Sequence, residues 1–264
     1  MKSYYPGKKF PSISITGTRC KLRCRHCYGH YLKSMIPAEN PEALLSLSHK
    51  LKEEGANGFL LSGGFDEAGK LPISRFVPII PEIEALGLEI NCHVGLVDDE
   101  LASRLRVLDV ASIEIVGSQK VINEMYNLRA SPSDYIRSAQ KLEKNGVRVV
   151  PHICAGLNYG LPSRETKALK MIGEGLKPEV LVITSLVPTP GTAVEGVKYE
   201  YDSVLRVIKK AVELFPDVEI ALGCMRLRSR GKEEFEERAI EMGVSRIAVP
   251  SKERGAKIEK CCAI

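Results

Sequence analysis

The sequence predicts a single α/β domain folded as a (β/α)8 barrel of the TIM type, and three observations support this. The length of 264 residues is one at which such barrels form a single domain. Short apolar runs rich in β-branched residues alternate with helical segments along the chain. No linker, repeat or low-complexity segment divides the chain. A doubly wound open sheet is the alternative arrangement of the same units.

Eight segments have the composition of buried parallel strands. They are residues 12–16, 58–62, 88–93, 112–116, 147–154, 180–186, 218–222 and 245–249. We expect the barrel to cover residues 1–250. Residues 251–264 do not resemble another βα unit, and we expect them to form a short cysteine-containing tail that folds over the mouth of the barrel, where the carboxyl ends of the strands lie.

Four helices between these strands have clear start and stop signals. They are residues 41–54, 133–144, 201–215 and 233–242. The first follows the N-cap residue Asn40 and stops at Gly55, and the second stops at Asn145 and Gly146. A further helix within residues 72–86 is expected to be kinked or to start late because Pro78 and Pro81 lie in it.

Composition and charge exclude several classes of protein. Apolar residues make up 44% and charged residues 27%, which excludes a disordered chain and a membrane bundle. A net charge of +5 with alternating signs does not indicate a nucleic-acid partner. The absence of an 18-residue apolar run and of a signal-peptide core indicates a cytoplasmic protein without membrane contact. In that reducing compartment the eight cysteines are expected to bind metal or act in catalysis.

Three cysteines follow the first predicted strand with the spacing C-x3-C-x2-C, namely Cys20, Cys24 and Cys27. Three thiolates so close together can hold three irons of a [4Fe–4S] cluster and leave the fourth iron open for a substrate. Nearby cations lower the cost of gathering these thiolates; they are Arg19, Lys21, Arg23 and Arg25. A zinc site that uses His26 or His30 is the alternative, although zinc usually takes ligand pairs at another spacing.

This motif in the loop after the first strand of a βα barrel resembles the radical S-adenosylmethionine (SAM) enzymes, in particular the biotin synthase branch. The resemblance implies that Cys20, Cys24 and Cys27 carry the catalytic cluster. It also implies that SAM is cleaved reductively to a 5′-deoxyadenosyl radical, which abstracts hydrogen from an unactivated carbon. The electron would come from a donor such as ferredoxin.

Further positions at the strand ends match the SAM-binding motifs of this family. Ser62-Gly63-Gly64 resembles its Gly-Gly-Glu segment, although Phe65 replaces the glutamate. The segment that starts at Gly156 resembles its adenine-side glycine motif, with Glu165 displaced, and the segment 186–192 resembles its Met-Pro-x-Pro-Gly-Thr sequence. The resemblance assigns SAM binding to His26, Tyr28, Ser62, Gly63, Gly64, Glu114, Ser118, Gly156 and Val187.

Five other cysteines are candidate ligands of a second, auxiliary iron–sulfur cluster. Cys92, Cys154 and Cys224 lie at or just after the ends of predicted strands and are expected to reach the mouth, and Cys261 and Cys262 lie in the tail. Biotin synthase holds such a cluster with strand residues, and lipoyl synthase takes one ligand from its tail. Three or four of the five would be needed, and the sequence leaves open which; a free cysteine is often a small buried apolar residue.

The chain most resembles the smaller component of the archaeal-type, two-protein lipoyl synthase. The resemblance rests on the segment 186–192, on Gly223-Cys-Met-Arg226 and on Cys261-Cys262. It implies sulfur insertion into an octanoyl group on a lipoyl-carrier protein, together with a second radical SAM subunit. The alternatives are a maturase or methyltransferase acting on a small metabolite and, from another class, a non-catalytic iron–sulfur or zinc protein.

Overall fold

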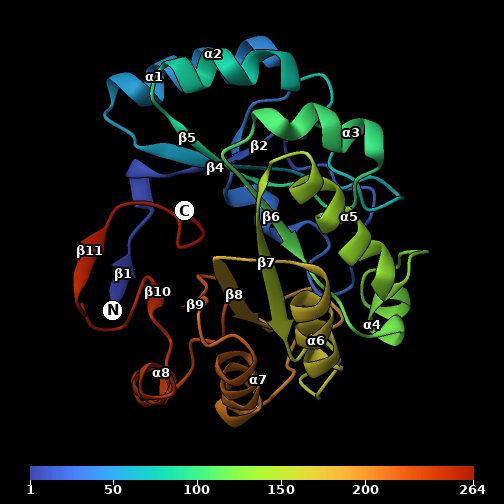
Figure 1. The fold of residues 1–264 in the computed structure, drawn as a ribbon, viewed down its shortest axis with the longest axis vertical. Coiled ribbons are helices and arrows are strands. Elements are labelled where there is room, and N and C mark those ends of the chain that lie inside the picture. The colour runs from blue at the N-terminus through green and yellow to red at the C-terminus, as the bar shows by residue number, and fades with distance from the viewer.

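The computed structural model describes residues 1–264, which form one curled parallel sheet with helices around its outside (Figure 1). Its eleven strands follow the order β11-β1-β10-β9-β8-β7-β6-β5-β4-β2-β3. They are β1 (Lys2–Tyr4), β2 (Ser12–Ser14), β3 (Ile36–Pro37), β4 (Gly58–Ser62), β5 (Glu89–His93), β6 (Val110–Glu114), β7 (Arg148–Ala155), β8 (Val180–Ser185), β9 (Glu219–Leu222), β10 (Arg246–Ala248) and β11 (Ala256–Ile258).

The sheet is a half-barrel rather than the closed barrel that the sequence predicts. Each of the eight predicted strands overlaps one of β2 and β4 to β10, which confirms the α/β class and the parallel order. Three short strands, β1, β3 and β11, were not expected. They occupy the two ends of the strand order, and no ladder joins β1 or β11 to β2 or β3. The ring of strands therefore stays open on that side.

Eight helices connect the strands. They are α1 (Pro41–Glu53), α2 (Ile80–Ala85), α3 (Asp99–Arg104), α4 (Gln119–Glu124), α5 (Pro132–Lys144), α6 (Glu165–Gly175), α7 (Tyr201–Leu214) and α8 (Lys232–Glu241). Asn40 caps α1, because its side chain accepts a hydrogen bond from the Ala43 amide at 2.8 Å. Helix α2 starts only at Ile80, after a 3-10 turn over Val77–Ile79, as expected from the prolines in this segment. None of the helices has both the length and the apolar composition of a membrane span.

Side chains of the strands alternate between two environments. Outward side chains such as Phe59 and Ile90 pack against the helices in the larger apolar core. Inward side chains such as Val110, Val150 and Val182 form a smaller apolar cluster inside the ring of strands. This inner space, called the bore below, is where groups from different strands can meet.

In the predicted tail (residues 251–264), residues 256–258 form β11, and the last residues, 259–264, enter the bore at the end where the strands begin. Figure 1 shows this end of the chain within the ring of strands. Four contacts hold it, from Asn57 Nδ2 to Glu259 O (3.1 Å), Lys260 Nζ to Glu89 Oε1 (2.6 Å), Arg246 Nη1 to Cys262 O (3.0 Å) and Arg148 Nη2 to Ala263 O (3.3 Å). The four partner residues each begin a strand or immediately precede one. The tail therefore lies opposite the mouth and not over it, unlike the sequence-based expectation, because its charged and backbone groups find their partners at the strand starts.

Candidate metal and cofactor site

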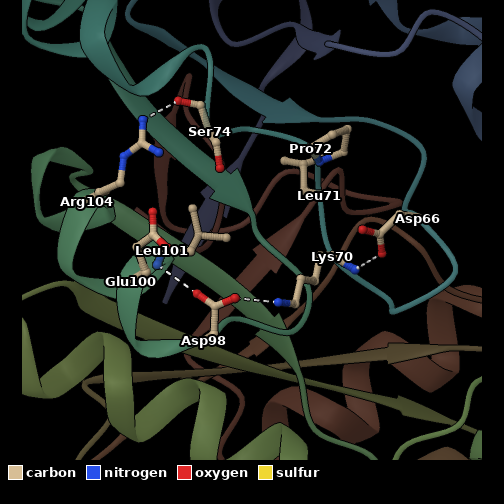
Figure 2. A pocket seen from close by; sticks show the side chains of 9 residues that line it. All are labelled: Asp66, Lys70, Leu71, Pro72, Ser74, Asp98, Glu100, Leu101 and Arg104. Carbon is tan, nitrogen blue, oxygen red and sulfur yellow. Dashed lines mark hydrogen bonds and ion pairs between the residues drawn. The ribbon is translucent and has the colours of Figure 1, made fainter.

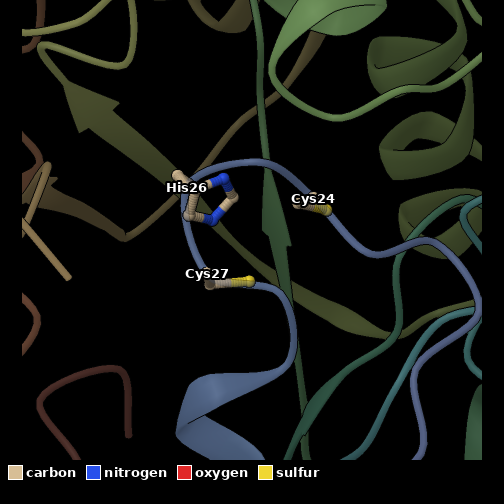
Figure 3. Close-up of side chains that lie close together, drawn as sticks. All are labelled: Cys24, His26 and Cys27. Carbon is tan, nitrogen blue, oxygen red and sulfur yellow. The ribbon is translucent and has the colours of Figure 1, made fainter. Parts of the chain in front are cut away.

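The three motif cysteines lie on the loop that follows β2, at the mouth. Cys24 is buried, and Cys20 and Cys27 are partly buried. The possible ligand atoms of Cys24, His26 and Cys27 all lie within 4.8 Å of one another, and Figure 3 shows the three side chains on this loop. The thiol of Cys20 lies apart from this group and donates to Phe65 O at 3.8 Å. The spacing in the sequence thus produces a compact thiol group that is suited to a metal centre.

The hydrogen bond between Cys24 and Cys27 shifts the pKa values of these two thiols in opposite directions. A hydrogen bond with Cys24 lowers the pKa of Cys27 to about 4, against the opposing effect of burial, and His26 contributes further. The pKa of Cys24 is raised by the same hydrogen bond and by burial. Burial alone would lower the pKa of His26, but the neighbouring Cys27 and Glu114 raise it. Cys27 is therefore already favoured as a thiolate, the form that binds metal.

The loop after β4 supports the cysteine loop directly. Phe65 O accepts hydrogen bonds from the amides of Lys21 (3.0 Å) and Leu22 (3.1 Å), and the Gly64 amide donates to Thr16 Oγ1 at 2.6 Å. A Cβ atom on Gly64 would lie 1.9 Å from Arg19 O, so only glycine permits this approach. The Ser62-Gly63-Gly64 segment is therefore packed against the motif, and the backbone oxygen of Phe65 holds the cysteine loop.

Three buried polar atoms beside the motif have no hydrogen-bond partner. They are His26 Nδ1, Glu114 Oε1 and Tyr126 OH. The His26 and Tyr126 rings meet edge to face, with their centroids 5.4 Å apart. Burial raises the pKa of Glu114, and the hydroxyl of Tyr126 opposes that shift. Unpartnered buried groups are costly, so their gathering at one place fits a polar ligand such as SAM.

Tyr126 was not found by sequence reasoning. It follows helix α4 in a segment without a glycine motif or a metal-ligand spacing, so no signal in the sequence singles it out. It becomes a candidate only because the fold brings it beside Glu114 and His26.

The loops after β7 and β8 complete the mouth. Glu165 Oε1 accepts from the Gly156 amide and from Ser163 Oγ, both at 2.9 Å, so this displaced glutamate shapes the loop after β7. Gly156 has φ +80°, which favours glycine. Tyr31 OH lies 2.7 Å from Thr189 Oγ1 and connects the cysteine loop to the segment that contains Val187. The two segments therefore follow β7 and β8 and lie at the mouth.

Two of the expected SAM-binding residues have other contacts. Tyr28 is 42% exposed, and the guanidinium of Arg23 lies 5.8 Å from the centre of its ring. Ser118 caps α4 by accepting a hydrogen bond from the Val121 amide at 3.4 Å. The structure therefore shows a surface contact for Tyr28 and a capping contact for Ser118.

The five other cysteines do not share one location. Cys92 lies fully buried in the core between sheet and helices, because its neighbours Asn91 and His93 take the inward positions of β5. Cys154 faces the bore beside Glu114, whose charge, after burial, raises its pKa. Of the remaining three, Cys224 is exposed and follows the end of β9, whereas Cys261 is partly buried and Cys262 is buried among inward side chains of the strands.

A separate cavity of about 220 Å³ contains none of the expected site residues (Figure 2). It lies between the segment after β4 and helix α3. Its main charged groups already have partners within the chain: Lys70 Nζ lies 2.5 Å from Asp98 Oδ2, and Arg104 Nη2 donates to Ser74 O at 2.7 Å. The cysteine loop is therefore the better candidate for chemistry.

A parallel α/β half-barrel with three cysteines on one loop at its mouth, two of them grouped with a histidine, is typical of an enzyme that binds a metal cluster at the strand ends. Residues 14–166, more than half of the chain, match the family model of the radical SAM superfamily. The chain therefore belongs to the radical SAM superfamily. In this family the site holds a [4Fe–4S] cluster and SAM, and the thiols and unpartnered polar atoms described above fit both groups.

Curated relatives are biotin synthases of low identity. The chain is 28% identical over 167 residues to the biotin synthase of Nitrosopumilus maritimus (strain SCM1), covering 59% of this chain and 48% of the relative. It is 26% identical over 226 residues to that of Coxiella burnetii (strain Dugway 5J108-111), covering 80% and 67%. The chain thus spans about half to two thirds of the length of these relatives.

Solved structures confirm the fold. HydG, a maturase of the [FeFe]-hydrogenase, is similar with a TM-score of 0.66 and 16% identity over 94% of this chain and 56% of that chain. Methylornithine synthase (PylB) has a TM-score of 0.62 and 16% identity over 97% and 77%. At this identity the likeness concerns the fold alone.

Proposed function

We propose that this chain is a sulfur-inserting radical SAM enzyme, a component of a lipoyl synthase that acts on an octanoyl group carried by a lipoyl-carrier protein. The observation that carries the proposal is a second set of cysteines outside the motif: Cys154 near the end of β7, Cys224 just after β9, and Cys261 and Cys262 among inward side chains of the strands. A hydrogen-abstracting enzyme has no need of these thiols, whereas sulfur insertion needs a sulfur source. Biotin synthases among the relatives support this choice.

The residues of the mouth have distinct roles in this proposal. Cys20, Cys24 and Cys27 hold three irons, and His26, Glu114 and Tyr126 offer their unpartnered polar atoms to SAM. When bound, the cluster and SAM supply a 5′-deoxyadenosyl radical that removes a hydrogen atom from an unactivated carbon.

The lipoyl assignment rests on finer features of the sequence. These are the Pro-Thr-Pro-Gly-Thr segment before Ala193, Gly223-Cys-Met-Arg226 and the Cys261-Cys262 pair. The proposal includes a second radical SAM subunit, an electron donor such as ferredoxin and a reducing compartment such as the cytoplasm.

Transfer of deuterium tests the proposal. The anaerobically reconstituted protein is reduced with SAM and a carrier domain that bears a perdeuterated octanoyl-lysine, and 5′-deoxyadenosine is analysed by mass spectrometry. We expect deuterium in 5′-deoxyadenosine and sulfur on the octanoyl chain, and neither with Cys24→Ala. SAM cleavage without deuterium transfer would contradict the lipoyl assignment, and a methylated product would favour the methyltransferase alternative. A colourless protein with stoichiometric zinc would support the non-catalytic alternative.

A further inference from the structure

A second surface cavity, of about 550 Å³, borders the cysteine loop. Three segments form its walls: Lys21 and Leu22 in the cysteine loop, Glu67 in the loop after β4, and residues 123–129, which end and follow α4. Leu22 is buried, whereas the charged and amide side chains that line the cavity are exposed. The cavity is therefore open to solvent, and part of the motif forms its wall.

The cavity is rich in hydrogen-bond donors. Lys21 contributes an ammonium group and Arg129 a guanidinium group, and neither side chain forms an ion pair within the chain. The amides of Asn123 and Asn127 also line it. Because Asn123 Oδ1 already accepts a hydrogen bond from Gln119 Nε2 at 2.9 Å, its amide nitrogen is left to donate to an external group. These groups together suit an anionic partner.

The charge around the cavity is positive on balance. Glu67 is the only acidic residue that lines it. Arg23 and Arg25 of the cysteine loop are two further exposed cations, and the Arg25 amide donates to Met125 O at 2.7 Å, which joins this loop to the segment after α4. A positive surface of this kind attracts a negatively charged protein and speeds its association.

The position of the cavity favours one kind of acidic partner. Leu22 lies two residues from Cys20 and two from Cys24, so the cavity wall belongs to the loop that holds the cluster. Electron transfer through protein slows steeply with distance, and a protein that reduces this cluster must therefore bind close to the loop. A carrier of an octanoyl-lysine has no such need, because its acyl group is at the end of a long flexible arm.

We propose that this cavity is the docking site of the protein that reduces the cluster, a one-electron carrier with an acidic surface. Lys21 and Arg129 pair with carboxylates of the carrier, and the amides of Asn123 and Asn127 donate hydrogen bonds to them. One electron leaves the docked carrier and enters the cluster, and no bond is made or broken in this step. The inference rests on the proposed function only for the need of a protein electron donor.

Rates of SAM cleavage with two electron donors test the site. Formation of 5′-deoxyadenosine is measured without an octanoyl substrate, first with limiting reduced [4Fe–4S] ferredoxin of acidic surface and then with reduced methyl viologen, a small cation that needs no cationic docking site. We expect Arg129→Glu to lower the ferredoxin-dependent rate about tenfold, the lower end of the range for electrostatic steering. The viologen-dependent rate should stay unchanged, because Arg129 lies outside the cysteine loop.

Two further variants serve as controls. Arg129→Lys keeps the positive charge and should keep most of the ferredoxin-dependent rate. Arg106 is also an exposed cation without an ion pair, but it lies in the 3-10 turn Leu105–Val107 that precedes β6, at the strand-start end. Arg106→Glu makes the same change in net charge as Arg129→Glu and should leave both rates unchanged.

Salt dependence and cross-linking locate the contact. The ferredoxin-dependent rate of the wild type should fall as salt is added, because exposed charges are screened beyond about 10 Å at 0.1 M ionic strength. The rate of Arg129→Glu should depend less on salt. Carbodiimide treatment couples lysine amines to carboxylates, and mass spectrometry should find Lys21 joined to ferredoxin.

Three results would overturn the docking site. They are equal ferredoxin-dependent rates in wild type and Arg129→Glu, an equal loss with both electron donors, and cross-links that form only at lysines remote from the cavity. A failed deuterium transfer together with the expected effect of Arg129→Glu would contradict only the lipoyl assignment. Conversely, deuterium transfer with no effect of Arg129→Glu would contradict only the docking site.

Discussion

Asn91 and Cys261 are joined by a hydrogen bond from Nδ2 to Sγ at 3.4 Å, although 170 positions separate them in the chain. The Asn91 side chain is fully buried, and its Oδ1 accepts a second hydrogen bond from Ser112 Oγ at 2.7 Å. One carboxamide therefore connects β5, β6 and the tail. This contact fixes the position of a thiol that would otherwise belong to a free chain end.

Replacing Asn91 should loosen the tail. Asn91→Ala leaves Ser112 Oγ without a partner in a buried place, so we expect the free energy of unfolding to fall by about 1–3 kcal/mol. Alkylation of Cys261 in the metal-free protein should become faster. Urea unfolding and mass spectrometry of iodoacetamide-treated protein measure both effects. Asn57→Ala is the control, since it removes only an exposed contact with Glu259; equal alkylation rates in all three proteins would contradict this role of Asn91.

Two adjacent glycines should differ in their tolerance of a methyl group. In Gly64→Ala the new Cβ would lie 1.9 Å from Arg19 O and 2.5 Å from the Cα of Cys20, so the cysteine loop must move. A displacement of about 1 Å at a reacting centre costs on the order of 100-fold in rate, and we expect SAM cleavage to fall by about that factor. In Gly63→Ala the nearest atom is Thr16 Oγ1 at 3.1 Å, so the loss should be much smaller. Equal rates in the two variants would contradict the close approach of the loops.

The buried ion pair of Arg226 and Glu236 should contribute strongly to stability. Their atoms lie 2.7 Å apart with both side chains 1% exposed, and Arg226 also donates to Gly223 O just after β9 and to Ala248 O at the end of β10. Arg226→Ala leaves a buried carboxylate without compensation, which costs about 3–5 kcal/mol. Thermal and urea unfolding measure this loss. Lys252→Ala, which breaks the exposed pair with Glu233 on the same helix, should cost less than about 1 kcal/mol. Similar losses in the two variants would contradict the difference in burial.

Acid should weaken the strand-start end of the sheet through Glu219. Its hydrogen bond with Arg246, with a further one from Lys2, lowers its pKa to about 2. A lowered folded-state pKa gives stability that is present above the unfolded pKa, about 4.3, and is lost as the pH falls toward 2. Glu219 is 35% exposed, so after discounting for solvent screening we expect Glu219→Gln to cost about 1 kcal/mol at pH 7.

The difference between wild type and Glu219→Gln should then shrink between pH 5 and pH 2 as the carboxylate is protonated. Melting temperatures across this range measure the effect. Glu174→Gln on α6 makes no ion pair and serves as the control. A difference that stays constant down to pH 2 would contradict an ionic origin.

Local chemistry explains what could be predicted from the sequence. Apolar β-branched runs identified β2 and β4 to β10, and Asn40 and the prolines around Val77 identified the starts of α1 and α2. The three motif cysteines lie within eight consecutive residues, and local turns bring Cys24 and Cys27 together, as the hydrogen bond from Cys27 N to Cys24 O at 3.1 Å shows. Features that depend on interactions between residues close together in the chain can therefore be predicted from the sequence.

Features that depend on contacts between residues far apart in the chain could not be predicted from the sequence. Strands of a parallel sheet are buried on both faces, so composition did not show that Cys92 faces the helices while Asn91 faces the bore. Tyr126 becomes a candidate site residue only because the fold places it beside His26 and Glu114.

The sequence by itself determined the parallel α/β class and the thiol motif, because both depend on periodicity and spacing along the chain. Only the tertiary structure decided that the sheet stays open and that the tail lies among the strand starts. Those outcomes depend on which residues, distant in the chain, form hydrogen bonds with buried polar atoms. Arg148 and Arg246, for example, donate to the backbone oxygens of Ala263 and Cys262 in the tail. That choice is made by packing in three dimensions and leaves no pattern in the sequence.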